Sequence, residues 1–292
     1  MNDLNISKLD NQKFNGLYLV ATPIGNLADF SHRAKLILDD ANQIACEDTR
    51  HTRKLLNHFN ITTPTTAYHE YNAEKVRPKL LNRLSKGELI VLVSDAGTPL
   101  ISDPGFKLVR EAIELGINIS GVPGPNAGIF ALILSGLPTN RYLFLGFLPS
   151  RGYARKSILE EIANVKASLV IHEAPRRLLS LLKDAKEILG NREAAIAREL
   201  TKMHEEMLRG SLTNLIEDLD KISELKGEIT LVIGPPSEAQ EMADLGSFDI
   251  EIDELMEAKS PSEVAKILAR KTGIPRQKIY QRAISRKNNV NK

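Results

Sequence analysis

The chain has 292 residues, of which 42% are hydrophobic and 26% are charged, and its formal net charge is +2. This composition is typical of a soluble globular protein with two or three domains, and no apolar run approaches the roughly 20 residues that cross a bilayer. The polar stretch MNDLNISKLDNQKFN predicts no signal peptide, and the single Cys46 excludes an internal disulfide, so we expect a cytoplasmic protein. Neither CxxC nor HExxH occurs, so no metal site is expected.

Charge is distributed unevenly along the chain. Residues 260–292 contain nine Lys or Arg and one acid, which gives this segment a charge of +8 and leaves −6 for the rest. The preceding segment, 237–259, contains eight acids and one Lys. A strongly basic end on a mildly acidic body favours a polyanionic partner, with a solvated basic tail as the alternative.

The first half of the chain alternates short apolar runs with segments of helical spacing. Strands are expected at 16–22, 43–48, 89–93 and 117–122, and helices at 31–41, 76–87, 105–116 and after 128. Strands that alternate with helices indicate an α/β domain with a largely parallel sheet.

A second set of elements begins near Arg141. Strands are expected at 142–147, 167–173, 193–200 and 227–234, and helices at 153–165, 175–189 and 211–222. The last segment has two short helices around a turn at Gly273-Ile274, which is the helix-turn-helix layout. The expected parts are a polar tail at 1–15, α/β domains at 16–137 and 138–236, an acidic linker at 237–259 and a basic helix-turn-helix-like module at 260–292.

Four loops of unusual composition follow successive strands of the first domain. They are TPIGN at 22–26, EDTR at 47–50, SDAGTP at 94–99 and VPGPNA at 122–127. Ligands bind outside the carboxyl ends of strands in open α/β sheets, and glycine lets the backbone approach a ligand closely. Any one loop could be explained by turn formers, but four together favour a binding site. GxGxxG does not follow the first strand and GxxxxGK[ST] does not occur, so a standard Rossmann site and a phosphate loop are not indicated.

These motifs resemble, in order and spacing, those of the bacterial small-subunit ribosomal RNA 2'-O-ribose methyltransferases of the tetrapyrrole methylase superfamily. The segments that carry the resemblance are VATPIGNLAD, ACEDTRHTRKLL, VSDAGTPLISDPG, VPGPNAGIFALILSGLP, FLGFLPSR, HEAPRRL and ARELTKMHEE. They cover residues 16–234. One departure is IHEAP, where the family more often has an aromatic residue and Tyr before the Glu.

The resemblance implies two α/β domains of the tetrapyrrole methylase type with a cofactor cleft between them, plus a small helical C-terminal module. It implies S-adenosylmethionine as cofactor and, as substrate, the ribose 2'-hydroxyl of a cytidine in the decoding region of small-subunit ribosomal RNA. It also implies recognition within the assembled small subunit, and a homodimer. Carried over by motif, the cofactor-binding residues are Pro23, Asp95, Ala96, Gly97, Thr98, Asn126, Ala127, His172 and Glu173.

Methyl transfer to a hydroxyl is helped by removal of its proton, so acids at the strand ends are candidate bases. Glu47, Asp48 and Asp103 are the candidates in the first domain, and Glu173 is the candidate in the second. Asp103 could instead cap the helix that begins at Pro104. The sequence does not single out one base.

Three cations accompany these acids. Arg50, Arg198 and Lys202 could hold phosphate or lower the pKa of a hydroxyl, and Lys202 joins the catalytic candidates. Alternatively, the two arginines form ion pairs with neighbouring acids and Lys202 is a solvated charge.

In the last helix, Arg276, Lys278 and Arg282 lie near one face with Tyr280 among them, a pattern that suits phosphate contacts and base stacking. Protein docking is the alternative for this module. Two other functions remain open: methylation of a tetrapyrrole or a protein side chain on the same fold, and a non-catalytic RNA-binding role in ribosome assembly. The basic tail argues against a small substrate, and the four strand-end loops argue against a scaffold.

Overall fold

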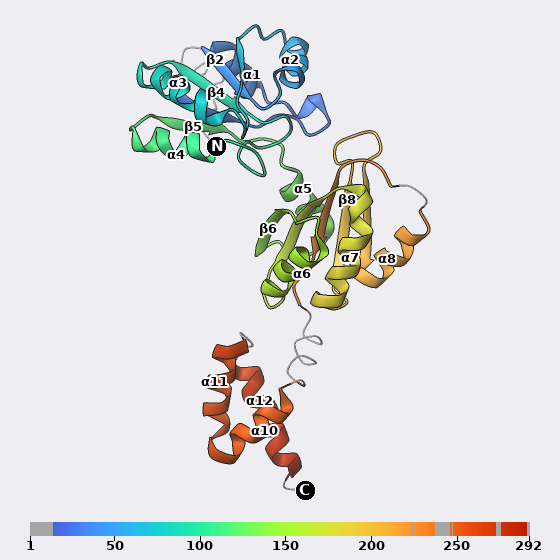
Figure 1. The fold of residues 1–292 in the computed structure, drawn as a ribbon. Helices are drawn as coiled ribbons and strands as arrows, with labels where there is room; N and C mark the ends of the chain where they lie inside the picture. Colours follow the sequence, from blue (N-terminus) through green and yellow to red (C-terminus); the bar gives the residue numbers. More distant parts are fainter. Residues whose placement is uncertain (1–13, 223–224, 237–245, 247, 273–275, 291–292) are drawn as a thin grey trace, which may run out of the picture. The chain divides into compact units, whose positions relative to one another are not determined.

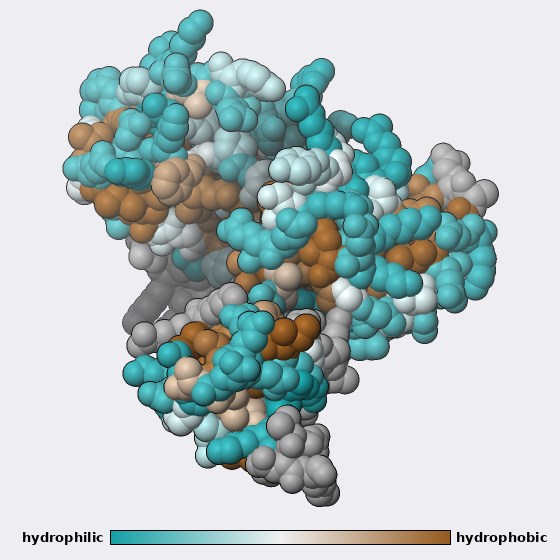
Figure 2. Space-filling view, turned by 60° about the horizontal axis from the view of Figure 1, so that its bottom comes forward, coloured by the Kyte–Doolittle hydropathy of each residue, from teal (hydrophilic) through white to brown (hydrophobic). Residues whose placement is uncertain are grey.

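A computed structural model describes residues 14–222, 225–236, 246, 248–272 and 276–290 (Figure 1). The chain divides into two compact units. The first comprises residues 1–134, 197–207 and 228–230, and the second comprises 135–196, 208–227 and 231–292. No helix in the described ranges is long and apolar enough to cross a membrane. On the face seen in Figure 2, hydrophilic side chains cover most of the surface and hydrophobic ones form restricted patches.

The first unit is built on a five-stranded sheet in the order β3-β2-β4-β1-β5, in which all neighbouring strands are parallel. The strands are β1 (Gly16–Val20), β2 (Gln43–Cys46), β3 (Thr65–Ala67), β4 (Leu89–Val93) and β5 (Ile119–Val122). Every residue of β4 is buried, as expected for a central parallel strand covered on both faces. Alternate residues serve two cores, because Leu89, Val91 and Val93 pack in one and Ile90 and Leu92 in the other.

Helices supply the other half of each core. They are α1 (His32–Asp40), α2 (Thr49–His58), α3 (Ala73–Ser85), α4 (Phe106–Glu114) and α5 (Ala127–Ser135), with a short 3-10 turn η2 (Leu27–Asp29). Buried residues of α1 and α2 line one core, and those of α3 and α4 line the other. The expected α/β class with a parallel sheet is therefore confirmed. The sequence patterns missed α2 and β3, since EDTR reads as a loop although Asp48 is the N-cap of α2.

The second unit contains a sheet in the order β6-β7-β10-β8-β9, with β6 and β7 parallel. Its strands are β6 (Tyr142–Phe147), β7 (Ser168–Glu173), β8 (Glu193–Arg198), β9 (Glu206–Ser211) and β10 (Ile229–Ile233). Its helices are α6 (Gly152–Glu161), α7 (Pro175–Leu189) and α8 (Leu212–Asp220). The strand β9 was not expected. The loop between β8 and β9, within residues 197–207, groups with the first unit.

Three helices at the C-terminal end share a core of their own: α10 (Asp249–Ala258), α11 (Pro261–Thr272) and α12 (Arg276–Val290). The last two match the expected helix-turn-helix pair, whose turn at 273–275 lies outside the described residues. The acidic segment expected as a linker is helical from Asp249 to Ala258, which the sequence analysis did not foresee. The reason is hydrophobic spacing, because Ile252, Leu255 and Met256 recur at helical intervals and pack into this core.

Candidate active site

The loops after β1 and β4 are hydrogen bonded to each other at one edge of the first sheet. Thr22 N–H donates to Gly97 O at 2.9 Å, and Gly97 N–H donates to Thr22 O at 3.0 Å. The Thr22 hydroxyl donates to Ser94 O at 3.2 Å, and the Ser94 hydroxyl donates to Gly97 O at 2.9 Å. Gly97 has a φ of 83°, a conformation that favours glycine. The two loops therefore form one braced surface.

The loop after β5 joins this surface through two expected cofactor residues. The Thr98 hydroxyl donates to Pro125 O at 3.0 Å, and the Asn126 amide donates to Thr98 Oγ1 at 3.4 Å. Asn126 Oδ1 also accepts from Ile129 N–H at 3.0 Å, which caps the start of α5. Thr98 and Asn126, predicted from separate motifs, thus lie side by side, with Ala127 as the first residue of α5.

A hollow of about 250 Å³ lies between the loop after β1, helix α2 and the end of β4. Its lining residues are Thr22, Pro23, Gly25, Leu27, His51, Thr52, Lys54, Leu55, Ser94 and Asp95. Pro23 and Asp95 belong to the expected cofactor set. Asp95 is followed by the exposed Ala96 and the buried Gly97, so small residues leave the backbone of this loop accessible.

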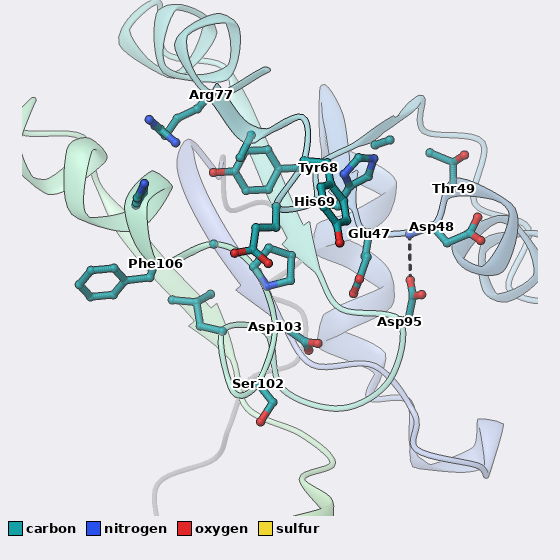
Figure 3. A pocket seen from close by; sticks show the side chains of 18 of the residues that line it. Glu47, Asp48, Thr49, Tyr68, His69, Arg77, Asp95, Ser102, Asp103 and Phe106 are labelled. Atoms are coloured by element: carbon teal, nitrogen blue, oxygen red, sulfur yellow. Dashed lines mark hydrogen bonds between the residues drawn. The ribbon is translucent and has the colours of Figure 1, made fainter. Parts of the chain in front are cut away.

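A larger pocket, of about 1220 Å³, opens at the carboxyl ends of β2, β3 and β4 (Figure 3). The residues that line it are Glu47, Asp48, Thr49, Arg50, Ala67, Tyr68, His69, Glu70, Tyr71, Ala73, Glu74, Arg77, Asp95, Leu100, Ser102, Asp103, Pro104, Gly105, Phe106 and Lys107. Asp95 lines both this pocket and the smaller hollow. The pocket and the braced loops therefore share one edge of the sheet, which is where the sequence placed the site.

Three carboxylates, those of Glu47, Asp95 and Asp103, gather in this pocket (Figure 3). Burial, together with the charges of Glu47 and Asp95, raises the pKa of Asp103 to about 6. Asp95 Oδ1 accepts the Asp48 N–H at 3.1 Å, so it holds the loop after β2 in place. Asp103 does not cap the helix that follows it, which was the alternative prediction, because the N-cap of α4 is Gly105. No group of three or more His, Cys, Asp or Glu in the described parts of the chain is placed to hold a metal ion.

Asp48 has a different environment although it is adjacent to Glu47 in sequence. Its carboxylate accepts from Arg50 N–H at 2.8 Å and pairs with Arg50 Nη2 at 2.8 Å. The hydrogen bond from the Arg50 side chain holds the pKa of Asp48 well below its usual range. Asp48 is thus a cap and ion-pair residue with a weakened affinity for protons, and Arg50 is its partner.

The loop between β8 and β9 lies against the loop after β1 within the first unit. Lys202 Nζ pairs with Glu199 at 2.9 Å and with Glu228 at 3.3 Å. A Cβ built on Gly25 would lie 2.4 Å from Lys202 Cγ, so the two loops are in close contact. Arg198 Nε pairs with Glu206 at 2.9 Å, which is the ion-pair alternative considered above. Glu199 and Thr201 both have positive φ, a strain often found at functional loops.

His172 and Glu173 end β7 in the second unit. The Glu173 side chain is fully buried, accepts Ala174 N–H at 2.7 Å and pairs with Arg177 at 3.1 Å. The His172 ring packs against Phe144 and Phe147, with centroids 5.2 and 5.6 Å away. These contacts tie Glu173 to the first turn of α7 and leave it a poor candidate for a base.

The C-terminal candidates are largely engaged within their own module. Arg282 forms an ion pair with Asp249 at 2.6 Å, and Arg286 pairs with Asp249 and Asp253. Arg276 donates to Ser262 Oγ at 2.7 Å. Tyr280 is 41% exposed and Lys278 is half-buried. The sequence analysis predicted Arg282 as an RNA contact because it did not predict helix α10. The acids Asp249 and Asp253 of this helix are four residues apart and pair with Arg282 and Arg286.

Several pocket residues were missed by the sequence analysis. They are Tyr68, His69, Tyr71, Arg77 and Phe106. A signal was present in AYHEY at 67–71, where two tyrosines and a histidine follow a strand end, but β3 was not identified. Arg77 lies on α3 and Phe106 begins α4, so only the packing of these helices reveals their place.

Comparisons with known proteins agree with this architecture. The model of the Tetrapyrrole (Corrin/Porphyrin) Methylases matches residues 16–216. A protein of Mesorhizobium japonicum, Ribosomal RNA small subunit methyltransferase I, is 46% identical over 93% of this chain and 92% of its own length. A protein of the same name from Halalkalibacterium halodurans is 45% identical over 90% of this chain and 93% of its own length.

Solved structures show the same fold at low sequence identity. Uroporphyrin-III C-methyltransferase from Thermus thermophilus, in a complex with S-adenyl homocysteine, is 19% identical with a TM-score of 0.50. The match covers 74% of this chain and 96% of that chain. Together with the family match and the high identity of the relatives, the sheet order and the strand-end loops lead to one conclusion: this chain belongs to the tetrapyrrole (corrin/porphyrin) methylase family.

Proposed function

We propose that this protein transfers a methyl group from S-adenosylmethionine to the ribose 2'-hydroxyl of a cytidine in the decoding region of small-subunit ribosomal RNA. The observation that carries the proposal is the half-buried Asp103 beside Glu47, in a pocket that adjoins the braced strand-end loops. The name shared by the two relatives supports ribosomal RNA as the substrate. The cytidine, the 2'-hydroxyl and the decoding region rest on the resemblance of the sequence motifs.

The residues present fit S-adenosylmethionine, which supplies an electrophilic methyl group on a sulfonium centre. An ammonium or a ribose hydroxyl of such a molecule needs a carboxylate, and Asp95 places one at the loop surface. Thr98 and Asn126 hold the loops after β4 and β5 together, and the backbone of these loops, which leads into Ala127, could bind the polar edges of the cofactor. Pro23 lines the adjoining hollow. A role for His172 and Glu173 in cofactor binding rests on the resemblance of the sequence motifs alone.

Asp103 is the base in this proposal. At pH 7 a group with a pKa of about 6 is mostly a carboxylate, yet it holds a proton more strongly than an ordinary aspartate. Asp103 would accept the proton of the 2'-hydroxyl and later release it to solvent, while S-adenosylmethionine would supply the methyl group and leave as S-adenosylhomocysteine. Asp48 is the weaker candidate, because its pairing with Arg50 lowers its proton affinity.

The charge of the pocket favours a nucleoside over a tetrapyrrole. Its lining includes six carboxylates against the three cations Arg50, Arg77 and Lys107, and Arg50 is already paired with Asp48. A tetrapyrrole with several carboxylates of its own would be repelled by this wall. A neutral base and ribose can enter, provided that the phosphates remain outside.

The experiment that tests the proposal uses the purified protein, S-adenosylmethionine and small ribosomal subunits from cells that lack the gene. We expect mass mapping to find one methyl group on one cytidine, at a linkage that has become resistant to alkaline hydrolysis. Methyl transfer to a base, or no transfer to RNA, would overturn the proposal. The same assay on free RNA tests the expected need for an assembled subunit, and sedimentation tests the expected homodimer. The cytoplasmic location also stays a prediction.

A further inference from the structure

Two large aromatic side chains border the pocket although they contribute to neither core of the first unit. Tyr71, in the loop after β3, is 96% exposed, and Phe106, the first residue of α4, is 67% exposed. Both line the pocket of about 1220 Å³. Other residues of α4, Leu108 and Ala112, are fully buried in a core, so the fold does not need Phe106 for packing. We call Tyr71 and Phe106 the aromatic rim.

Two residues that line the same pocket, His69 and Arg77, carry buried side-chain nitrogens. Nδ1 of His69 has no hydrogen-bond partner among the described residues, whereas the Arg77 side chain is hydrogen bonded to Tyr68. Arg77 is held by Glu111, with its Nε 2.7 Å from a carboxylate oxygen. Buried polar atoms are normally paired, so the unpaired Nδ1 of His69 leaves one polar position beside the pocket for a ligand group to fill. The edge of a nucleobase offers such groups, including ring nitrogens and carbonyl oxygens.

The carboxylates restrict which part of an RNA can make contact here. Glu47, Asp95 and Asp103 would repel a phosphate, so the backbone of the RNA cannot lie along this wall. Base faces are uncharged and stack on aromatic side chains, which is how proteins hold unpaired nucleotides. An aromatic rim around an acidic interior therefore suits an RNA segment whose bases point inward and whose phosphates stay outside.

We propose that the aromatic rim is a stacking platform for unpaired bases of the RNA substrate, and that it positions the target nucleotide so that its ribose reaches Asp103. This inference rests on the proposed function and adds how the substrate is held. Tyr71 and Phe106 are positioning residues in this scheme, since they contact bases and not the reacting atoms. His69, which also lines the pocket, then lies beside the base that enters.

The test uses the full-length protein and a short single-stranded oligoribonucleotide with 2-aminopurine next to a cytidine. Stacking on an aromatic ring quenches the fluorescence of this base, so quenching reports the contact directly. We expect Tyr71→Leu and Phe106→Leu to weaken binding by about tenfold each and to reduce the quenching. Tyr71→Phe and Phe106→Tyr keep the ring and should bind like the parent protein. Tyr153→Leu is the matched control, because Tyr153 is 88% exposed on α6 and is not among the residues that line this pocket.

The same variants are then assayed for methyl transfer to purified small subunits. We expect a higher KM for Tyr71→Leu and Phe106→Leu, with kcat changed much less. Unchanged quenching and KM in an active protein would overturn the stacking platform and leave the proposed function intact. An equal loss in Tyr153→Leu, or a change in self-association in place of RNA binding, would also overturn it. If the parent protein neither binds the oligoribonucleotide nor methylates the small subunits, both the proposed function and the platform are wrong.

Discussion

Carboxylates occur in two contrasting settings in this molecule, the pocket of the first unit and the C-terminal helices. Asp249 and Asp253 on α10 are matched by Arg282 and Arg286 on α12, and the arginines lower the pKa of both acids. In the pocket, no ion pair to Glu47, Asp95 or Asp103 is found within the described ranges, and the pKa of Asp103 is raised. Paired acids stabilise an interface between helices, whereas crowded acids retain an affinity for protons. This difference supports our proposal that the paired acids serve structure and the pocket acids serve chemistry.

The largest effect is expected for Asp103→Asn. An amide cannot accept the proton of a hydroxyl, so single-turnover methylation should fall by about 10²–10⁴-fold. Cofactor and RNA binding should persist, because the variant keeps the shape of the side chain. Glu254→Gln changes an exposed acid on α10 and is the control for a general effect of charge. A methylation rate within about threefold of the parent would show that Asp103 is not the base. The contrast between catalytic and structural acids would then no longer hold.

A pair of glycines tests the braced loops. Gly97 and Gly87 have nearly the same φ, 83° and 84°, but a Cβ on Gly97 would lie 3.2 Å from Ile24, while one on Gly87 meets nothing within 4 Å. Both alanine variants should lower the free energy of unfolding by about 1–2 kcal/mol through backbone strain. Only Gly97→Ala should also weaken S-adenosylmethionine binding, by about tenfold, since it displaces the loop that carries Thr98. Calorimetry measures the affinity, and an equal loss in both variants would show that strain alone is responsible.

The ion-paired acids of the C-terminal helices are tested by Asp249→Asn. This change removes ion pairs to Arg282 and Arg286 in a partly exposed site, so we expect α12 to lose about 1 kcal/mol of protection against hydrogen exchange. The released Arg282 should make RNA binding more salt-dependent, with a slope steeper by about one unit, whereas Arg286 keeps its pair with Asp253. Glu254→Gln on the same helix should change neither quantity. An unchanged salt slope in Asp249→Asn would mean that this face of α12 does not meet phosphate.

The smallest effect concerns stability and pH. The pKa of Asp103 is higher in the folded chain than its ordinary value of 3.8, so its contribution to stability is complete below about pH 4 and is lost as the pH rises through about 6. Asp103→Asn should therefore be more stable than the parent at pH 8, by about 1 kcal/mol after allowance for solvent screening, with no difference at pH 4. Thermal unfolding at both values measures this. For Asp249 and Asp253 the sign is opposite, since stability is lost as the pH falls below their ordinary range. If the parent protein is more stable than Asp103→Asn at pH 8, the neighbouring acids do not destabilise the Asp103 carboxylate.

The expected fold and part of the expected site follow from local patterns. The run LIVLV at 89–93 is β-branched or Leu throughout and is bounded by turn formers, so its place in a buried strand is readable from composition alone. The convergence of Thr98 and Asn126 is also readable, because the carboxyl ends of parallel strands meet at one edge. The short strand β3 could not be predicted, since TTA has only three residues and no apolar alternation.

What the sequence by itself determined was the α/β class, the edge of the sheet that carries the candidate site and the small set of acids near it, because strand period and turn chemistry are local properties. Only the tertiary structure separated Asp103 from Asp48, since a pKa depends on burial and on charges that arrive from other elements. It likewise showed that Arg282 is paired and that Tyr71 and Phe106 border one pocket. These residues lie far apart in the chain, and their juxtaposition depends on how helices pack, which no local pattern encodes.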